Sequence, residues 1–277
     1  MQISFHKMHG LGNDFVIIDT RGFDESPVDS FPPTFIKSLG DRKRGIGFDQ
    51  LIVMEAPKNP AADVFMRIIN NDGSEAEACG NATRCVAKLL MDELGRDGCV
   101  VETVAGLLGA SRHLDTYTIN MGKPRLEWDE IPLAAEADTL GLGFNVGPLM
   151  LPCAVNIGNP HAVFFVDNVD EIDLEYWGPQ VETHDMFPEK TNVEIAHITD
   201  RNTIRMRVWE RGVGITDACG SAACATMVAA VRRDLIGREA VVELDGGTLA
   251  FKWDAETGDL FMTGPVEYVF KGEVEFG

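Results

Sequence analysis

The sequence contains the same cysteine-headed segment twice, and this repeat constrains the fold more than any other feature. Ala78-Cys79-Gly80-Asn81 opens one apolar run, and Ala218-Cys219-Gly220-Ser221 opens another about 140 residues later. We therefore predict two tandem copies of one unit, related by a pseudo-twofold axis, with Cys79 and Cys219 facing each other where the copies meet. Further segments match in the same order: Gly12–Asp19 with Gly158–Asp167, Arg67 with Arg207, Gly95-Arg96-Asp97 with Gly237-Arg238-Glu239, Val100-Val101-Glu102 with Val241-Val242-Glu243, and Met121–Pro124 with Met262–Pro265.

Each cysteine is expected to head a buried helix. Nearly every residue from Ala218 to Val231 is small or apolar, but the run is shorter than the roughly 18 residues of a membrane span. Gly95 and Gly237 are predicted to stop the two helices in left-handed caps, and Thr216 or Asp217 is predicted to cap the second helix. A thiol in the first turn lies near free N–H groups, so we expect the pKa of Cys219 to fall below the ordinary value of about 8.5.

Composition excludes several classes of partner. The formal net charge of −20 argues against nucleic acid and anionic membranes, which both reward clustered Lys and Arg. A substrate that carries carboxylates would have to be attracted locally, by Arg and by helix N-termini. The first ten residues lack the pattern of a signal peptide, so a cytoplasmic protein is expected.

The six cysteines are predicted to be free thiols, as is usual in a long chain without a secretory signal. Cys99 and Cys153 lie in apolar, strand-like stretches, and Cys85 and Cys224 lie on the two helix bodies. All four are expected to be core residues. No Cys-x-x-Cys pair is present, and His6 and His9 with Cys79 and Cys85 lack the spacing of a zinc site. We expect no metal.

The remaining pattern predicts an α+β fold, with a curved or barrel-like sheet around a central helix in each of two pseudo-symmetric lobes. The N-terminal lobe is expected to span residues 1–121, with the C-terminal strand 266–277 returning to it. The C-terminal lobe is expected to span residues 122–265, and the active site to lie between the lobes. The turn at residues 45–50 lacks the Lys-Ser/Thr of a phosphate loop. The other predicted elements are a hairpin up to Asp19, helices at residues 33–39 and around 169–176, and strands at residues 51–54, 64–69, 100–103, 106–110, 117–121, 154–157, 162–166, 193–198 and 205–209.

Two thiols aimed at one cleft from opposite sides suit two-base proton transfer. One thiolate would remove a proton from a carbon acid on one face, and the opposite thiol would return a proton to the other face. Backbone N–H groups of Gly80, Asn81, Gly220 and Ser221 would hold the carboxylate next to the reacting carbon. This geometry requires no cofactor.

A set of short motifs runs along essentially the whole chain. In order, they are Gly10–Phe15, Gly45–Gln50, Asn71–Ser74, Ala78–Asn81, Gly158–His161, Trp209–Gly212 and Ala218–Ser221. Taken together, these motifs resemble the diaminopimelate epimerase family. The resemblance implies two similar lobes and a homodimer. It also implies pyridoxal-independent interconversion of LL- and meso-2,6-diaminopimelate by Cys79 and Cys219, in lysine and peptidoglycan-precursor synthesis.

The same resemblance implies a set of substrate contacts. Arg211 and the asparagines would read the distal L-centre, while His161 and Glu210 would tune the ionisation of the thiols. The alternative is that the asparagines and His161 only stabilise turns and have no role in the site. The implied binding residues are Asn13, Gln50, Asn70, Gly80, Asn81, Asn159, Asn192, Glu210, Arg211, Gly220 and Ser221. The chain departs from common family residues at Ala82, Ile215 and Ala222.

Other functions remain open at this stage. A cofactor-independent racemase of another amino acid, such as histidine or proline, would share the two cysteines, but its smaller substrate would not need Asn192 and Glu210-Arg211 for a distal end. Relatives of the phenazine-pathway isomerase type lack the cysteine pair. A thiol redox or metal-binding protein is the alternative from another class.

Overall fold

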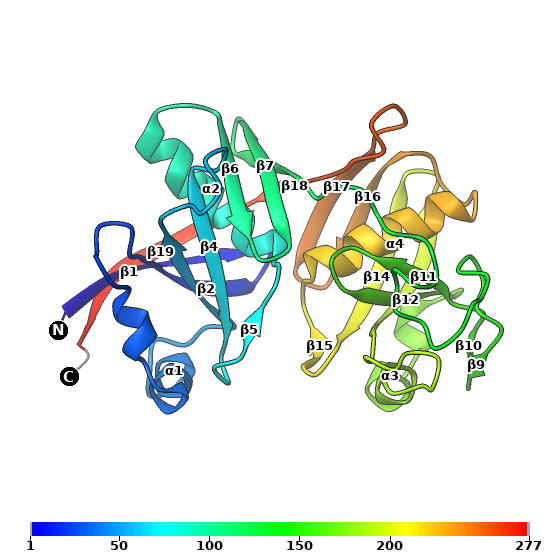
Figure 1. Ribbon diagram of the computed structural model, residues 1–277. Helices are drawn as coiled ribbons and strands as arrows, with labels where there is room; N and C mark the ends of the chain where they lie inside the picture. The colour runs from blue at the N-terminus through cyan, green and yellow to red at the C-terminus, as the bar shows by residue number, and fades with distance from the viewer. Residues whose placement is uncertain (1, 276–277) are drawn as a thin grey trace. The chain divides into compact units, whose positions relative to one another are not determined.

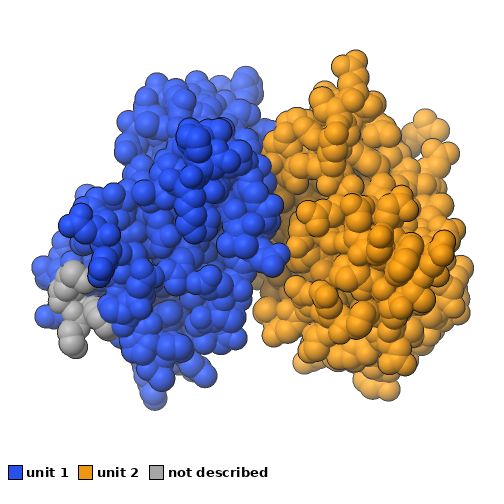
Figure 2. All heavy atoms as spheres, viewed as in Figure 1, with its two compact units in different colours: residues 1–119, 264–277 blue, residues 120–263 orange. Residues whose placement is uncertain are grey.

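A computed structural model describes residues 2–275, and residues 1, 276 and 277 lie outside the described part of the chain. The chain divides into two compact units (Figure 2), which are Met1–Ile119 with Gly264–Gly277, and Asn120–Thr263. These divisions lie within two residues of the lobe boundaries that the sequence suggested. Within residues 2–275, no helix is long and apolar enough to cross a membrane.

The first unit is an α+β structure in which a sheet surrounds helix α2 (Figure 1). Strands β1, β2, β6 and β7 all contact α2. Its elements are β1 (Gln2–Gly10), β2 (Asn13–Asp19), a 3-10 turn (Pro27–Ser30), α1 (Pro33–Gly40), β3 (Gln50–Glu55), β4 (Val64–Asn70), β5 (Glu75–Ala76), α2 (Gly80–Leu94), β6 (Gly98–Thr103), β7 (Gly106–His113), β8 (Thr116–Asn120) and β19 (Glu267–Glu275).

The second unit repeats this arrangement around helix α4. Strands β11, β12, β13, β14, β16 and β17 contact α4. Its elements are the short hairpin β9 (Asn145–Val146) and β10 (Leu149–Met150), then β11 (Cys153–Asn156), β12 (Pro160–Phe165), a 3-10 turn (Val169–Glu171), α3 (Leu174–Glu182), β13 (Asn192–Asp200), β14 (Thr203–Glu210), β15 (Gly214–Thr216), α4 (Gly220–Arg232), β16 (Glu239–Leu244), β17 (Gly247–Trp253) and β18 (Leu260–Pro265).

Strand pairing confirms the internal duplication. In the first unit β1 is antiparallel to β2, β2 is parallel to β3, and β3 is antiparallel to β4, which is parallel to β6. The second unit has the same sequence of pairings from β11 through β12, β13 and β14 to β16. The β6–β7 hairpin continues the first series and β8 follows antiparallel to β7, while the β16–β17 hairpin continues the second and β18 follows antiparallel to β17. β19 adds to the first unit alone, antiparallel to β1.

Alternation along the strands gives each sheet two buried faces. Val16, Ile18, Leu51 and Val53 belong to the core on the α1 side. Successive side chains of a strand point to opposite faces, so Phe15, Ile17 and Ile52 face α2. In the second unit Ala162, Phe164, Val193 and Ile195 belong to the core that covers α3. His161, Val163, Asn192 and Glu194 therefore face α4.

The helix predicted around residues 169–176 is wrong in its placement. The chain forms a 3-10 turn at Val169–Glu171, and α3 then runs from Leu174 to Glu182. Two separate side-chain caps explain this break. Asn168 accepts a bond from the N–H of Asp170, and Asp173 accepts one from the N–H of Tyr176, which starts a new helix.

The two predicted glycine stops differ. As predicted, Gly95 ends α2 in the left-handed region, with φ of 63°. Its N–H donates to the carbonyl of Met91. The prediction for Gly237 is wrong, because α4 already ends at Arg232 and Asp234 takes the left-handed turn, with φ of 58°. The helix itself ends before this glycine. A glycine at the end of an apolar run was therefore a poor guide to the helix end.

These stops generate a matched prediction. An added Cβ would meet no atom within 4 Å at either Gly95 or Gly237, so only backbone conformation distinguishes the two sites. Gly95→Ala should lower the free energy of unfolding by about 1–2 kcal/mol, because alanine is strained in the left-handed region. Gly237→Ala should change it by less than about 0.5 kcal/mol. Urea denaturation measures both variants, and an equal loss in the two would contradict this account of the helix stops.

Candidate active site

Cys79 lies at the start of α2, where the backbone is extended, with φ of −150° and ψ of 104°. Its half-buried thiol donates to the side-chain oxygen of Asn13 at 3.9 Å. Asn81 Nδ2 donates to the same oxygen at 3.2 Å. The first unit therefore brings Cys79, Asn13 and Asn81 together, as the resemblance implied.

A network of charges holds Asn13 in place. Asn13 Nδ2 donates to Asp49 at 3.0 Å, and the N–H of Asp49 bonds the carbonyl of Asp14 at 2.9 Å. Burial would raise the pKa of Asp14, but hydrogen bonds from Arg42 and Lys7 outweigh it and lower this pKa to about 2. Asp14 is thus an anion at neutral pH, and it anchors the turn that presents Asn13.

Gln50 and Asn70 form a second polar pair in the first unit. They are opposite each other on β3 and β4, and Gln50 Nε2 donates to Asn70 Oδ1 at 2.9 Å. Asn70 Nδ2 donates in turn to Ser74 at 3.0 Å. Asn71 has another role, because its side chain reaches the carbonyls of Gly40 and Phe48 at 3.4 Å and so ties the β4–β5 turn to the end of α1.

Cys219 occupies the equivalent position at the start of α4 and is only 8% exposed. It is itself the N-cap residue, and no side chain caps the helix. The predicted cap by Thr216 or Asp217 is therefore wrong. The Thr216 hydroxyl instead donates to Glu210 Oε1 at 2.5 Å, because β15 places Thr216 beside the end of β14.

The expected lowering of the Cys219 pKa is also wrong. Burial raises the pKa of this thiol well above its ordinary value, and the negative charge of Glu210 raises it further. Hydrogen bonds from Ser221, at 3.5 Å, and from the N–H of Ala222 lower it but do not offset the rise. Burial and the carboxylate of Glu210 thus outweigh the helix N-terminus.

His161 links two other polar residues of the second unit. Its Nδ1 lies 2.7 Å from Glu194 Oε1, and its Nε2 lies 2.8 Å from Asn159 Oδ1. His161 and Glu194 are both fully buried. The sequence reasoning missed Glu194. The signal for it was a single carboxylate between Val193 and Ile195 in an apolar strand, two residues after Asn192 and hence on the same face.

Asn192 and Arg211 lie at one end of the second sheet. Asn192 donates to the carbonyl of Pro160 at 2.9 Å and accepts from the N–H of Arg211 at 2.9 Å, so two backbone groups hold its side chain in place. The guanidinium of Arg211 bonds the carbonyl of Glu189 at 3.1 Å and is exposed.

The starts of α2 and α4 both present backbone N–H groups. The first intrahelical bonds are made by the N–H of Thr83 and of Ala223, which reach the carbonyls of Cys79 and Cys219. The N–H groups that precede them, including those of Gly80, Asn81, Gly220 and Ser221, therefore point out of the helix ends and can bind an anion. Among the family departures, Ala82 and Ala222 are fully buried in these first turns, while Ile215 is 40% exposed.

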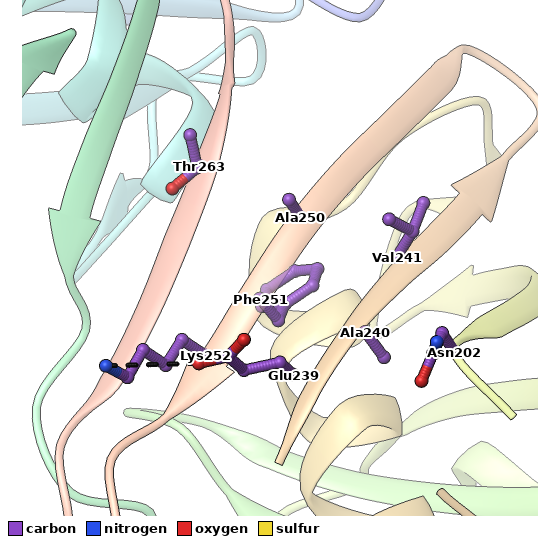
Figure 3. A pocket seen from close by; sticks show the side chains of 8 residues that line it. All are labelled: Asn202, Glu239, Ala240, Val241, Ala250, Phe251, Lys252 and Thr263. Carbon is purple, nitrogen blue, oxygen red and sulfur yellow. Dashed lines mark ion pairs between the residues drawn. The ribbon is translucent and has the colours of Figure 1, made fainter. Parts of the chain in front are cut away.

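A shallow hollow lies elsewhere on the second unit. It is formed by β16, β17 and the turn before β14, and none of the predicted site residues lines it (Figure 3). Lys252 and Glu239 form a 3.9 Å ion pair at its edge. In the described residues no group of three or more His, Cys, Asp or Glu side chains is placed to hold a metal ion.

Comparison with known proteins decides the family. The family model for diaminopimelate epimerase matches residues 5–127 and 153–269. The chain belongs to the diaminopimelate epimerase family. A relative from Rhodospirillum centenum named diaminopimelate epimerase is 52% identical over 271 residues, covering 98% of this chain and 91% of the relative. One of the same name from Erythrobacter litoralis is 48% identical over 280 residues, covering 100% and 99%. As a member of this family the chain is an isomerase.

Solved structures with the same fold include more distant proteins. A phenazine biosynthesis protein of the PhzF family from Bacillus anthracis has a TM-score of 0.69 at 18% identity, with 100% of both chains covered. A hydroxyproline epimerase from Agrobacterium vitis has a TM-score of 0.68 at 14% identity, covering 99% of this chain and 92% of the other. At such identities these likenesses show the fold alone.

The surroundings of Cys219 generate a prediction about its ionisation. Glu210→Gln removes a negative charge near the thiol but keeps an oxygen that can accept from Thr216, so the pKa of Cys219 should fall. The rate of alkylation of Cys219 by iodoacetamide, followed by peptide mass spectrometry, should then reach half its maximum at lower pH than in the unchanged protein. Glu239→Gln, on β16, is the matched control. A midpoint that stays in place or rises in Glu210→Gln would contradict the assigned role of the carboxylate.

Proposed function

We propose that this chain interconverts LL- and meso-2,6-diaminopimelate by proton transfer between two thiols at one α-carbon, in lysine and peptidoglycan-precursor biosynthesis. Relatives about half identical over nearly the full chain carry the name diaminopimelate epimerase. The observation that carries the mechanism is the duplication: equivalent helices in two equivalent units each begin with a cysteine. A racemase of another amino acid is not favoured by these relatives.

The proposed reaction inverts one centre without a cofactor. A thiolate takes the α-proton, so an S–H bond forms as the C–H bond breaks, and the electron pair moves towards the neighbouring carboxylate. The opposite thiol then gives its proton to the other face of the carbon, and the two cysteines exchange protonation states. N–H groups at the starts of α2 and α4 stabilise the negative charge that develops on the carboxylate.

The two cysteines differ in their surroundings, which supports an asymmetric resting state. Burial and the nearby carboxylate of Glu210 raise the pKa of Cys219, so we place a proton on Cys219 in the free enzyme. Cys79 is half-buried among the neutral side chains of Asn13 and Asn81. Cys219 would therefore act as the acid and Cys79 as the base in one direction, and these roles would reverse in the other.

The binding set is proposed to hold both ends of the substrate. The amides of Asn13, Asn81 and Asn159 lie beside a cysteine or beside His161 and would contact the substrate near the reacting centre. Arg211 would bind the distal carboxylate. The remaining proposed contacts are Gln50, Asn70, Asn192 and Glu210. This local set of donors would attract a dicarboxylic amino acid despite the negative charge of the whole chain.

One isotope experiment tests the reaction, the substrate and the need for a cofactor together. Reduced protein is incubated with LL-diaminopimelate in deuterated water, without added pyridoxal phosphate or metal. We expect deuterium at one α-carbon together with meso product. A folded protein with free thiols that gives no exchange would overturn the proposal.

Single cysteine variants test the two-base mechanism. Cys79→Ala and Cys219→Ala should each reduce epimerisation by at least about 1000-fold, because each removes one of the two groups that accept or donate the proton. Cys99→Ala is the matched control, since Cys99 is a buried residue of β6. It should retain near-normal turnover. Near-normal kcat in either of the first two variants, with an unchanged melting temperature, would remove that cysteine from the mechanism.

A homodimer is proposed through the outer surface of β19. Tyr268, Val269 and Phe270 are 41%, 52% and 44% exposed, and such contiguous apolar surface is typical of interfaces between proteins. Val269→Lys should shift the protein towards monomer in sedimentation velocity experiments. Val104→Lys, which changes an exposed valine in the β6–β7 turn, should not. A chain that sediments as a monomer before any substitution would contradict the dimer.

A cytoplasmic location is proposed from the cysteines. All six are free thiols, and the proposed reaction needs two of them reduced, as the cytoplasm ensures. Recovery of the native protein in a periplasmic or extracellular fraction would count against this location.

A further inference from the structure

The buried pair His161–Glu194 is not a requirement of the fold, because the first unit lacks it. His161 is opposite Asn192 on the parallel pair β12–β13, and Val163 is opposite Glu194. The equivalent parallel pair β2–β3 matches Phe15 with Gln50 and Ile17 with Ile52. By this register His161 corresponds to Phe15, and Glu194 corresponds to Ile52. Both positions in the first unit are apolar and fully buried.

The second unit has therefore replaced a stable apolar contact by a buried acid and base. This replacement is costly, because Glu194 Oε2 is buried and has no hydrogen-bond partner among the described residues. The pair lies on the face of the sheet towards α4, whose first residue follows Cys219. A buried polar pair at such a position points to a role in the site rather than in packing.

Hydrogen bonds link Asn159, His161 and Glu194, and the acceptor at the Asn159 end decides where one proton lies. Asn159 Oδ1 can only accept, so His161 Nε2, at 2.8 Å, must carry a hydrogen. The 2.7 Å contact between His161 Nδ1 and Glu194 Oε1 holds one further proton, on either atom. In both forms the pair has no net charge, and in both forms Nε2 is a donor.

This arrangement fixes the orientation of the Asn159 amide. With its oxygen bonded to His161, its N–H groups turn away from the histidine, and Asn159 is itself partly exposed. A carboxylate can only accept hydrogen bonds. The fixed amide therefore offers donors to a substrate carboxylate, whereas a reversed amide would present an oxygen and repel it.

We propose that Glu194 is a positioning residue that acts through His161 to hold the Asn159 amide with its N–H groups towards the substrate carboxylate. The substrate part of this inference rests on the proposed function. Glu194 touches neither the substrate nor the reacting atoms. In the first unit Asn13 needs no such histidine, because Asp49 and Asn81 bond its amide directly.

Two variants separate positioning from packing. In Glu194→Gln the new amide N–H can donate to Nδ1, so Nε2 keeps its hydrogen and Asn159 stays fixed. In Glu194→Ile the imidazole loses its partner, either nitrogen can carry the hydrogen, and the amide can reverse. We expect KM for diaminopimelate to rise roughly tenfold to a hundredfold in Glu194→Ile, as for a lost hydrogen bond to a charged group. In Glu194→Gln it should stay within about threefold, with kcat little changed in both variants.

The control is His197→Leu, further along β13 from Asn192, which removes a histidine bonded to the carbonyl of Val166. It should leave KM unchanged. If Glu194→Ile does not fold, the double variant His161→Phe with Glu194→Ile restores the apolar pair of the first unit and should fold, with the same rise in KM. Equal rises in Glu194→Gln and Glu194→Ile, or no rise in the folded double variant, would overturn the proposal.

Nitrogen-15 NMR of labelled histidine tests the same inference without substrate. His161 Nε2 should show a directly bonded hydrogen in the unchanged protein and in Glu194→Gln, and a mixture of tautomers in Glu194→Ile. An unprotonated Nε2 in the unchanged protein would overturn the positioning role. This readout stays valid if the chain does not act on diaminopimelate, so failure of the substrate proposal and failure of the positioning role are distinguishable.

Discussion

The burial of a helix N-terminus inside each sheet is the constraint on which the rest of the structure depends. A helix start has backbone N–H groups without intrahelical partners, and burying them is costly unless an acceptor meets them. In both units the first of these helical residues follows a cysteine in extended conformation, and no side chain caps the helix. Each sheet therefore encloses a helix end with a thiol beside it. In the proposed reaction a substrate carboxylate is the acceptor that meets these N–H groups.

The charges around these helix ends make the two thiols unequal. Cys79 lies beside the amide of Asn13, which is held by a network of ions around Asp14, whereas Cys219 is buried near the carboxylate of Glu210. A two-base inversion needs one thiol and one thiolate at the same time. Identical sites would have no preference for which cysteine keeps the proton. The burial of Cys219 and the carboxylate of Glu210 supply that preference, and they act against the helix N-terminus of the second unit.

Most of the fold was predictable because it depends on local patterns that recur. The duplication, the hairpins, the strand positions and the stop at Gly95 follow from matching segments and from alternation. The errors arose where a residue's neighbours in space decide. Glycine at 237 carries no left-handed turn because the helix had ended earlier, and Asp173 restarted a helix that the sequence placed too early. The pKa of Cys219 is raised because the thiol is buried and because Glu210, on another strand, lies near it. Glu194 was missed for the same reason.

Divergence between the copies explains why a duplicated fold can act on one centre asymmetrically. The register of β2–β3 matches that of β12–β13, so each position of one unit has a counterpart in the other. Phe15 and Ile52 keep the apolar contact, while His161 and Glu194 replace it by a neutral pair with one fixed donor. Gln50 and Asn70 similarly correspond to Asn192 and Glu210. The backbone supplies two similar helix ends, and in the mechanism proposed here differences at a few positions decide where the proton rests and which way an amide points.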